Sequence, residues 1–196
     1  MKRSGLVILA IIAALVLWGI STQRGLVGQD ETVKNAWNKV QSAYQQRSDL
    51  VGQLVNTVKG VANFEQKTLT DVIEARAKAT SITLDAKDLT PENMAKFQAA
   101  QEQLKGSLSR LMLVAEQYPQ LKATENFTKL QGQLESIENG VKADRNTFND
   151  AVQSYNVKVR SFPASAIAGI LGFKAKEGFK ADAGTEKAPV VNFETK

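Results

Sequence analysis

The sequence predicts an all-α protein, namely an elongated antiparallel four-helix up-and-down bundle preceded by one N-terminal transmembrane helix. A segment of 19 residues without charge, Ser4–Thr22, opens the chain. At about 1.5 Å per residue it would span roughly 28 Å, close to the hydrocarbon thickness of a bilayer. Apolar residues recur at heptad spacing through most of the remaining chain, and no convincing strand pattern interrupts them.

Residues 1–22 are predicted to be a membrane anchor, and residues 23–29 a short linker. The chain has no cysteine, which rules out a lipoprotein signal. Residues Trp18–Gln23, at the end of the apolar segment, fit a signal-peptide cleavage site poorly, because such sites carry small residues in an A-x-A-like pattern. A cleaved signal peptide and a buried core helix stay open as alternatives. Lys2 and Arg3 precede the segment, so the positive-inside rule predicts a single-pass protein with a cytoplasmic N-terminus and an extracytoplasmic body.

The helical body is predicted over residues 30–163. Its first helix is expected from Asp30 to Lys59, with Gly60 as a cap after its end. Its apolar positions alternate in steps of four and three, the a/d pattern of a packed bundle, and one of them is the charged Arg47. The seam consists of Val33, Trp37, Val40, Tyr44, Arg47, Val51, Leu54, Val58 and Val61. A second helix is expected from Asn63 to Ser81.

Thr90 and Pro91 form a start signal for the third helix, with a hydroxyl cap followed by proline at the first helical position. This helix is expected to continue to Tyr118 and to end at Pro119. The fourth helix is expected from about Thr124 to Pro163. Its heptad positions include the charged Asp144 and Lys158. A straight helix drifts slowly relative to a seven-residue repeat, and this drift would place neighbouring residues in the core instead of these two. The neighbours are Arg145, Val152 and Val159, and the last seam position is Phe162.

Residues 164–181 are small and apolar at first and then basic. Two interpretations stay open, a cap over the end of the bundle and a segment lying in the membrane interface. The candidate interface residues are Ile167, Ile170, Leu171, Phe173 and Lys174. Residues 182–196 are expected to be a disordered tail, with Val190, Val191 and Phe193 as an alternative short docking motif.

The amino-acid composition excludes more classes of function than any motif does. Histidine and cysteine are absent, which removes the commonest general base, the usual zinc and haem ligands and all thiol chemistry. No calcium-loop motif is present, and the net charge of +5 is spread without a run of five like charges. We therefore expect no enzyme, no metal or other cofactor, no small-molecule substrate and no nucleic-acid partner. The expected partners are the lipid bilayer and proteins at the membrane, including a second copy of the chain.

Several blocks of the sequence resemble the LemA family. Asp49-Leu50-Val51 with Thr57-Val58-Lys59-Gly60 is similar to its first motif, DLIPNLVxTVKG, although Gly52-Gln53 replaces the usual Pro-Asn. Other similar blocks are Glu74-Ala75-Arg76, Leu108-Ser109-Arg110-Leu111, Tyr118-Pro119, Phe148-Asn149-Asp150-Ala151-Val152, Tyr155-Asn156, Ser161-Phe162-Pro163 and Gly172-Phe173-Lys174. The resemblance covers about Val33 to Phe179.

The resemblance implies a bacterial membrane protein with a single anchor and a helical bundle, placed in the inner (cytoplasmic) membrane. Within the family, an extracytoplasmic N-terminus is the alternative orientation. The molecular activity of such proteins is not established. Together with the absence of catalytic residue types, it predicts a scaffold or adaptor of the cell envelope. The alternative is a membrane-remodelling or lipid-surface-binding protein that acts through the C-terminal apolar segment.

Charged and amide residues recur in the family-like blocks and form a candidate polar network. They are Arg47, Asp49, Glu74, Arg76, Arg110, Arg145, Asn149, Asp150 and Asn156. Because a charge in a helix seam is costly unless it is paired, we expect Arg47 and Asp49 to pair with Arg145, Asp150 or Glu74 across the bundle. The alternative is a site where carboxylates and arginines bind a ligand or an ion.

Overall fold

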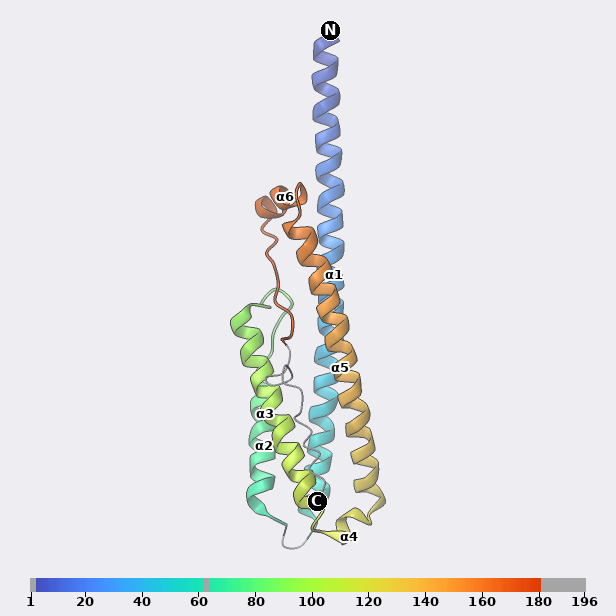
Figure 1. The fold of residues 1–196 in the computed structure, drawn as a ribbon, viewed down its shortest axis with the longest axis vertical. Helices are drawn as coiled ribbons and strands as arrows, with labels where there is room; N and C mark the ends of the chain where they lie inside the picture. Colours follow the sequence, from blue (N-terminus) through green and yellow to red (C-terminus); the bar gives the residue numbers. More distant parts are fainter. Residues whose placement is uncertain (1–2, 62–63, 181–196) are drawn as a thin grey trace, which may run out of the picture.

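The computed structural model describes residues 3–61 and 64–180, and within these ranges it contains helices and no strand. In the described part of the chain, six helices follow one another (Figure 1). They are α1 (Arg3–Lys59), α2 (Gln66–Ser81), α3 (Pro91–Ala115), α4 (Pro119–Lys122), α5 (Glu125–Arg160) and α6 (Ala164–Leu171). The predicted all-α class with one apolar N-terminal helix is confirmed.

Helix α1 contains both the apolar segment and the first helix of the body. Its 57 residues correspond to about 86 Å of continuous helix. The linker expected at residues 23–29 is therefore wrong, because these residues are helical. Leu26, in the middle of that stretch, is fully buried, and Lys158 of α5 lies directly over Gly25. Packing against α5 holds this part of α1 helical despite its glycines.

The boundaries of α2 and α3 agree with the start and stop signals at two of four ends, the end of α2 and the start of α3. Helix α2 ends at Ser81 as expected but begins at Gln66, three residues later than predicted. Thr90 caps α3, with its Oγ1 accepting the Asn93 N–H at 3.3 Å, and Pro91 is the first helical residue. Helix α3 stops at Ala115 rather than Tyr118, since a residue before proline disfavours the helical conformation and Pro119 opens the short α4.

Helix α5 begins after Thr124 and ends at Arg160. Val152 and Val159 are buried while Lys158 is only half-buried, so the predicted drift of the apolar positions is confirmed there. At the third position Arg145 is half-buried like Asp144, and no such replacement is seen. Phe162 is 88% exposed, and its predicted seam position is wrong. The reason is that α5 has already ended two residues earlier, which takes Phe162 off the packed face.

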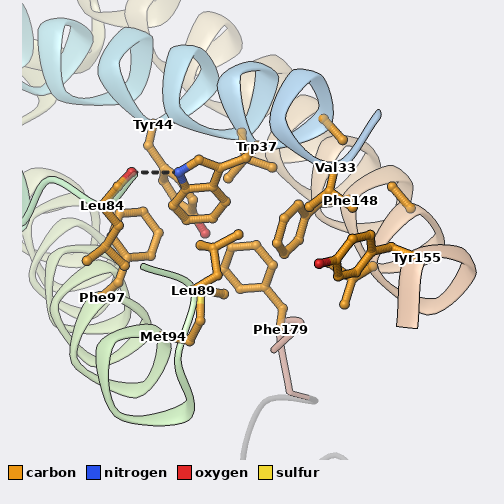
Figure 2. Close-up of a cluster of buried hydrophobic side chains, with 14 of the residues drawn as sticks. Val33, Trp37, Tyr44, Leu84, Leu89, Met94, Phe97, Phe148, Tyr155 and Phe179 are labelled. Carbon is orange, nitrogen blue, oxygen red and sulfur yellow. Dashed lines mark hydrogen bonds between the residues drawn. The ribbon is translucent and has the colours of Figure 1, made fainter. Parts of the chain in front are cut away.

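The core formed by the described residues consists of two clusters along the length of α1. The proximal cluster, nearer the apolar segment, surrounds Trp37, whose ring contacts Phe97, Phe148 and Phe179 at centroid distances of 5.3, 5.1 and 6.1 Å (Figure 2). The Trp37 indole also donates to the Leu84 carbonyl at 2.7 Å. The distal cluster joins the end of α1 to α2, α3 and the start of α5 through Val51, Leu54, Val72, Leu111 and Phe127.

Candidate functional site

The chain returns along the bundle after α6 as an extended segment, residues 173–180, here called the strap (Figure 1). Gly172 begins this turn in the left-handed conformation, with φ 78°, which favours glycine. The strap runs alongside α5 in the opposite direction and reaches the loop before α3, where the Glu177 N–H donates to the Leu89 carbonyl. It therefore joins parts of the chain that are far apart in sequence.

Two asparagines of α5, one heptad apart, hold the strap by its main chain. The Asn156 side chain donates to the Lys176 carbonyl at 2.8 Å and accepts the Lys176 N–H at 2.8 Å. Asn149 does the same for Phe179, donating to its carbonyl at 3.2 Å and accepting its N–H at 2.8 Å. Each amide thus satisfies both polar groups of one strap residue, as a neighbouring strand would.

Further contacts tie the strap to other helices. Lys176 Nζ lies 3.0 Å from Asp30 of α1 and donates to the Ala86 carbonyl at 2.7 Å. The Tyr155 hydroxyl donates to the Lys174 carbonyl at 2.9 Å. The Phe179 ring is buried in the proximal cluster. The strap is consequently an integral part of the fold and closes one side of the bundle.

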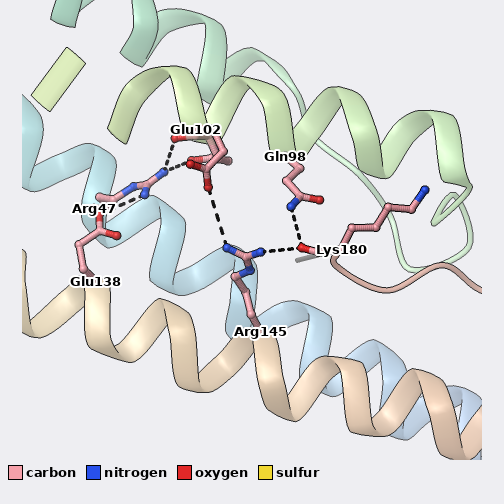
Figure 3. Close-up of polar contacts among 7 residues, drawn as sticks. Arg47, Gln98, Glu102, Glu138, Arg145 and Lys180 are labelled. Atoms are coloured by element: carbon pink, nitrogen blue, oxygen red, sulfur yellow. Dashed lines mark hydrogen bonds and ion pairs between the residues drawn. The ribbon is translucent and has the colours of Figure 1, made fainter. Parts of the chain in front are cut away.

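The strap reaches Lys180 between α3 and α5 (Figure 3). The Lys180 carbonyl accepts hydrogen bonds from Gln98 of α3 at 3.0 Å and from Arg145 of α5 at 3.3 Å. The Arg145 guanidinium also lies 4.6 Å from the centre of the Phe179 ring and 4.0 Å from Glu102. Arg145 therefore positions the end of the strap.

Arg47 is a second polar centre, buried at its seam position on α1. Its guanidinium forms an ion pair with Glu138 of α5 at 3.1 Å and donates to both the carbonyl and the side-chain oxygen of Gln101 on α3 (Figure 3). It also lies 4.8 Å from the centre of the Tyr44 ring. The predicted pairing of Arg47 with Arg145, Asp150 or Glu74 is wrong in its partners, although a cross-bundle ion pair is present.

The remaining candidate residues lie apart from these two centres. Arg76 donates to the Ser48 carbonyl at 2.8 Å, and Arg110 lies 3.8 Å from Glu65. Asp49 accepts from Gln45 of its own helix, while Glu74 and Asp150 are exposed. The nine candidates thus form separate contacts rather than one network. Sequence reasoning missed the strap, for which the heptad separation of Asn149 and Asn156 was the available signal.

We expect the two asparagines to protect different amides. Asn149→Ala should speed amide hydrogen exchange at Phe179 more than at Lys176, because it removes the acceptor of the Phe179 N–H. Asn156→Ala should reverse the order. Each variant should cost about 1–2 kcal/mol of unfolding free energy for its two lost hydrogen bonds. Equal acceleration at both amides in either variant would contradict separate clamps.

Tyr155 gives the strap a dependence on alkaline pH. Burial, together with the nearby Asp30 carboxylate, raises the pKa of Tyr155 to about 12. Since the pKa of Tyr155 in the folded protein lies above the ordinary tyrosine value of 10.0, the stabilisation is complete below pH 10 and is lost as the pH rises towards about 12. In the Tyr44→Phe/Tyr118→Phe background, Tyr155 is the only tyrosine. Tyrosinate absorbance should then titrate near pH 12, and a midpoint near 10 would contradict this account.

Helix α6 lies beside α1 at the end of the apolar segment (Figure 1). Ile167 Cδ1 comes within 4.0 Å of a Cβ built on Gly19, so α6 stands at the level of residues predicted to lie in the membrane. Ile170 is 84% exposed, and Leu171 and Lys174 are exposed as well. Ile167 and Phe173 are half-buried and pack against the proximal cluster. Of the five candidate interface residues, three face outward and two belong to the packed end of the body.

Residues 3–61 and 64–180 were compared with the requirements of a metal site. These residues contain no group of three or more histidine, cysteine, aspartate or glutamate side chains that could hold a metal ion. The polar centres around Arg47 and Arg145 instead connect helices and hold the strap. Their geometry is that of structural contacts.

Helix α1 is the one helix among the described residues that is long and apolar enough to cross a membrane. Its large apolar side chains from Leu6 to Leu17 are all more than half exposed. Fold and site together define a class, that of helical proteins whose body is continuous with an apolar N-terminal helix. The chain belongs to the LemA family, whose match covers residues 36–193.

Curated relatives agree with this assignment. Protein LemA of Metamycoplasma hominis is 22% identical over 76% of this chain and 64% of its own length. Magnetosome protein MamQ 2 of Paramagnetospirillum magneticum is 32% identical over 38% of this chain and 27% of its own length. Magnetosome protein MamQ of Magnetospirillum gryphiswaldense is 33% identical over 37% of this chain and 27% of its own length. The chain thus spans less than two thirds of the length of these relatives. The exposed apolar part of α1 indicates a membrane location.

Proposed function

We propose that this LemA-family chain is a membrane-tethered, non-enzymatic scaffold or adaptor of the bacterial envelope. Its body is an elongated antiparallel four-helix up-and-down bundle formed by α1, α2, α3 and α5. The bundle presents long helical faces to proteins at the membrane, including a second copy of the chain. In this proposal the protein uses no cofactor, no nucleic acid and no small-molecule substrate.

The continuity of α1 is the observation that carries the proposal. The apolar segment enters the body without a break, and the adjoining Leu26 and Val33 are fully buried in the core. A flexible tether would let the body turn freely, whereas a single helix fixes its height and its direction relative to the bilayer. Fixed placement is useful to a protein that organises its neighbours.

The location that we propose is the bacterial inner membrane, with a cytoplasmic N-terminus and an extracytoplasmic bundle. Lys2 and Arg3 support this orientation through the positive-inside rule. The outward-facing Phe162, Ile170 and Leu171 would then rest on the outer headgroups beside α1. A membrane-remodelling activity of this segment is not favoured, because α6 packs against α1 and α5 as the end of the body.

Photocrosslinking in native membranes tests the scaffold proposal. A photoreactive residue would replace Val157, which is 59% exposed on α5, or Leu113, which is 70% exposed on α3. We expect a recurrent protein neighbour or a dimer from at least one face. A matched probe at the buried Val152, five residues from Val157, should give no intermolecular product. Capture of monomer alone from every exposed position would refute the proposal.

A further inference from the structure

The end of the body next to the apolar part of α1 carries cations without acids. It is formed by residues 3–29 of α1 and by residues 151–176, which include the end of α5 and all of α6 (Figure 1). All 20 acidic residues of the chain lie outside these two segments. Four cations within the two segments, here called the collar, are Arg24, Lys158, Arg160 and Lys174.

The collar lies close behind the level at which α6 meets α1. That level is marked by Gly19, beside which Ile167 of α6 packs. Lys158 of α5 lies across α1 at Gly25, where a Cβ would clash with its Nζ. Gly19 and Gly25 are six residues apart, which corresponds to about 9 Å along the helix. The Lys158 ammonium is therefore about one Debye length from the level of α6 at physiological ionic strength.

The length of α1 sets the depth of this end in a bilayer. The part of α1 that precedes the contact with α6, Arg3–Trp18, measures about 24 Å, less than the hydrocarbon thickness of about 30 Å. A bilayer crossed by α1 therefore extends to α6, whose Ile170 is 84% exposed and suits the boundary between headgroups and acyl chains. Headgroups occupy about 5–8 Å beyond the hydrocarbon, so the collar lies at their level.

We propose that the collar binds the phosphate groups of anionic phospholipids where α1, α5 and α6 meet. This inference rests on the membrane crossing by α1 that the proposed function includes. Within residues 3–61 and 64–180 none of the four cations has a carboxylate partner, whereas the neighbouring Lys176 is paired with Asp30. Each cation held near an anionic surface adds an attraction that decays over a Debye length.

Folding creates the collar from separate parts of the chain. Arg24 follows the apolar segment directly, whereas Lys158, Arg160 and Lys174 come from far along the sequence. These three are beyond the flanking charges that the positive-inside rule counts, so they do not decide the orientation of α1. Their role is headgroup recognition by the anchored body, which is distinct from membrane remodelling.

Lipid retention by the full-length chain tests the inference. The protein would be reconstituted in vesicles of equimolar phosphatidylglycerol and phosphatidylcholine, extracted in mild detergent and analysed for the lipids that stay bound. We expect phosphatidylglycerol to be enriched at least about fivefold. The variant Lys158→Gln/Arg160→Gln/Lys174→Gln should reduce this enrichment to below about twofold, because three of the four charges are removed.

A matched control removes three exposed lysines at the opposite end of the body. Lys59 ends α1, Lys67 lies in the first turn of α2, and Lys129 lies near the start of α5. The variant Lys59→Gln/Lys67→Gln/Lys129→Gln has the same net charge as the collar variant and should keep the full enrichment. An equal loss of enrichment in both variants would overturn the inference, since net charge alone would then account for lipid retention.

A charge-conserving variant separates charge from packing. Lys158→Arg/Arg160→Lys/Lys174→Arg should keep the enrichment, and its loss would contradict recognition by charge. Flotation of each variant with the vesicles in a density gradient reports membrane insertion. Full enrichment in a collar variant that still floats would overturn the inference and leave the membrane placement of the proposed function standing. A natural chain that fails to float would overturn both.

Discussion

Replacing Trp37 by alanine should lower the free energy of unfolding by about 3–5 kcal/mol, the cost typical of removing a large buried aromatic. Trp37 is 1% exposed and lies against the rings of Phe97, Phe148 and Phe179. These rings come from α3, α5 and the strap, so the indole is where three segments meet α1. The substitution would also leave the Leu84 carbonyl without its 2.7 Å donor.

Denaturant unfolding of the full-length protein in detergent, followed by circular dichroism, provides the measurement. Trp18→Ala is the matched control, because Trp18 is the other tryptophan and is 39% exposed on the apolar part of α1. It should leave the unfolding midpoint of the body unchanged. Trp37→Phe should retain part of the packing and lose less than half as much stability as Trp37→Ala. A loss below 1 kcal/mol for Trp37→Ala would contradict the central role of this residue.

Heptad periodicity and capping signals were sufficient to predict the long helices. The steps of four and three between apolar residues along α1 and α3 identify the buried face of each helix. Thr90-Pro91 predicts a helix start, and α3 begins there in the structure. These signals are local, since they depend on backbone geometry and side-chain spacing within one segment. The end of α3 was missed because α4 is a single turn, too short to show a period.

The contacts of the strap and of Arg47 could not be predicted from helix periodicity alone. The strap is recognised through its main chain, so its own side chains show no regular pattern, and its partners Asn149 and Asn156 are separated from it by a turn and α6. The sequence pattern also could not identify the partners of Arg47. A seam position indicates that a charge is buried, but the register between helices decides which carboxylate it meets. Here that carboxylate is Glu138 rather than Asp150 or Glu74.

Arg47→Met should lower the free energy of unfolding by about 2–3 kcal/mol. Removing one member of a buried ion pair typically costs about 3–5 kcal/mol, and the expected loss is smaller here because the Glu138 side chain is one-third exposed. The variant leaves Glu138 and Gln101 without their cation, while the methionine fills much of the space of the arginine stem. Lys142→Met, one turn further along α5 and exposed, should change stability by less than 0.5 kcal/mol.

A double-mutant cycle separates the contribution of the Arg47–Glu138 ion pair to stability from the contribution of side-chain packing at the two positions. Arg47→Met/Glu138→Met should recover most of the loss, because apolar replacements remove both charges and the Arg47 Nε–H, a buried donor with no acceptor among the described residues. The coupling between positions 47 and 138 should therefore be at least 1 kcal/mol in denaturant unfolding. Additive losses in the double variant would mean that Glu138 contributes nothing to holding Arg47, and that Gln101 alone accounts for its burial.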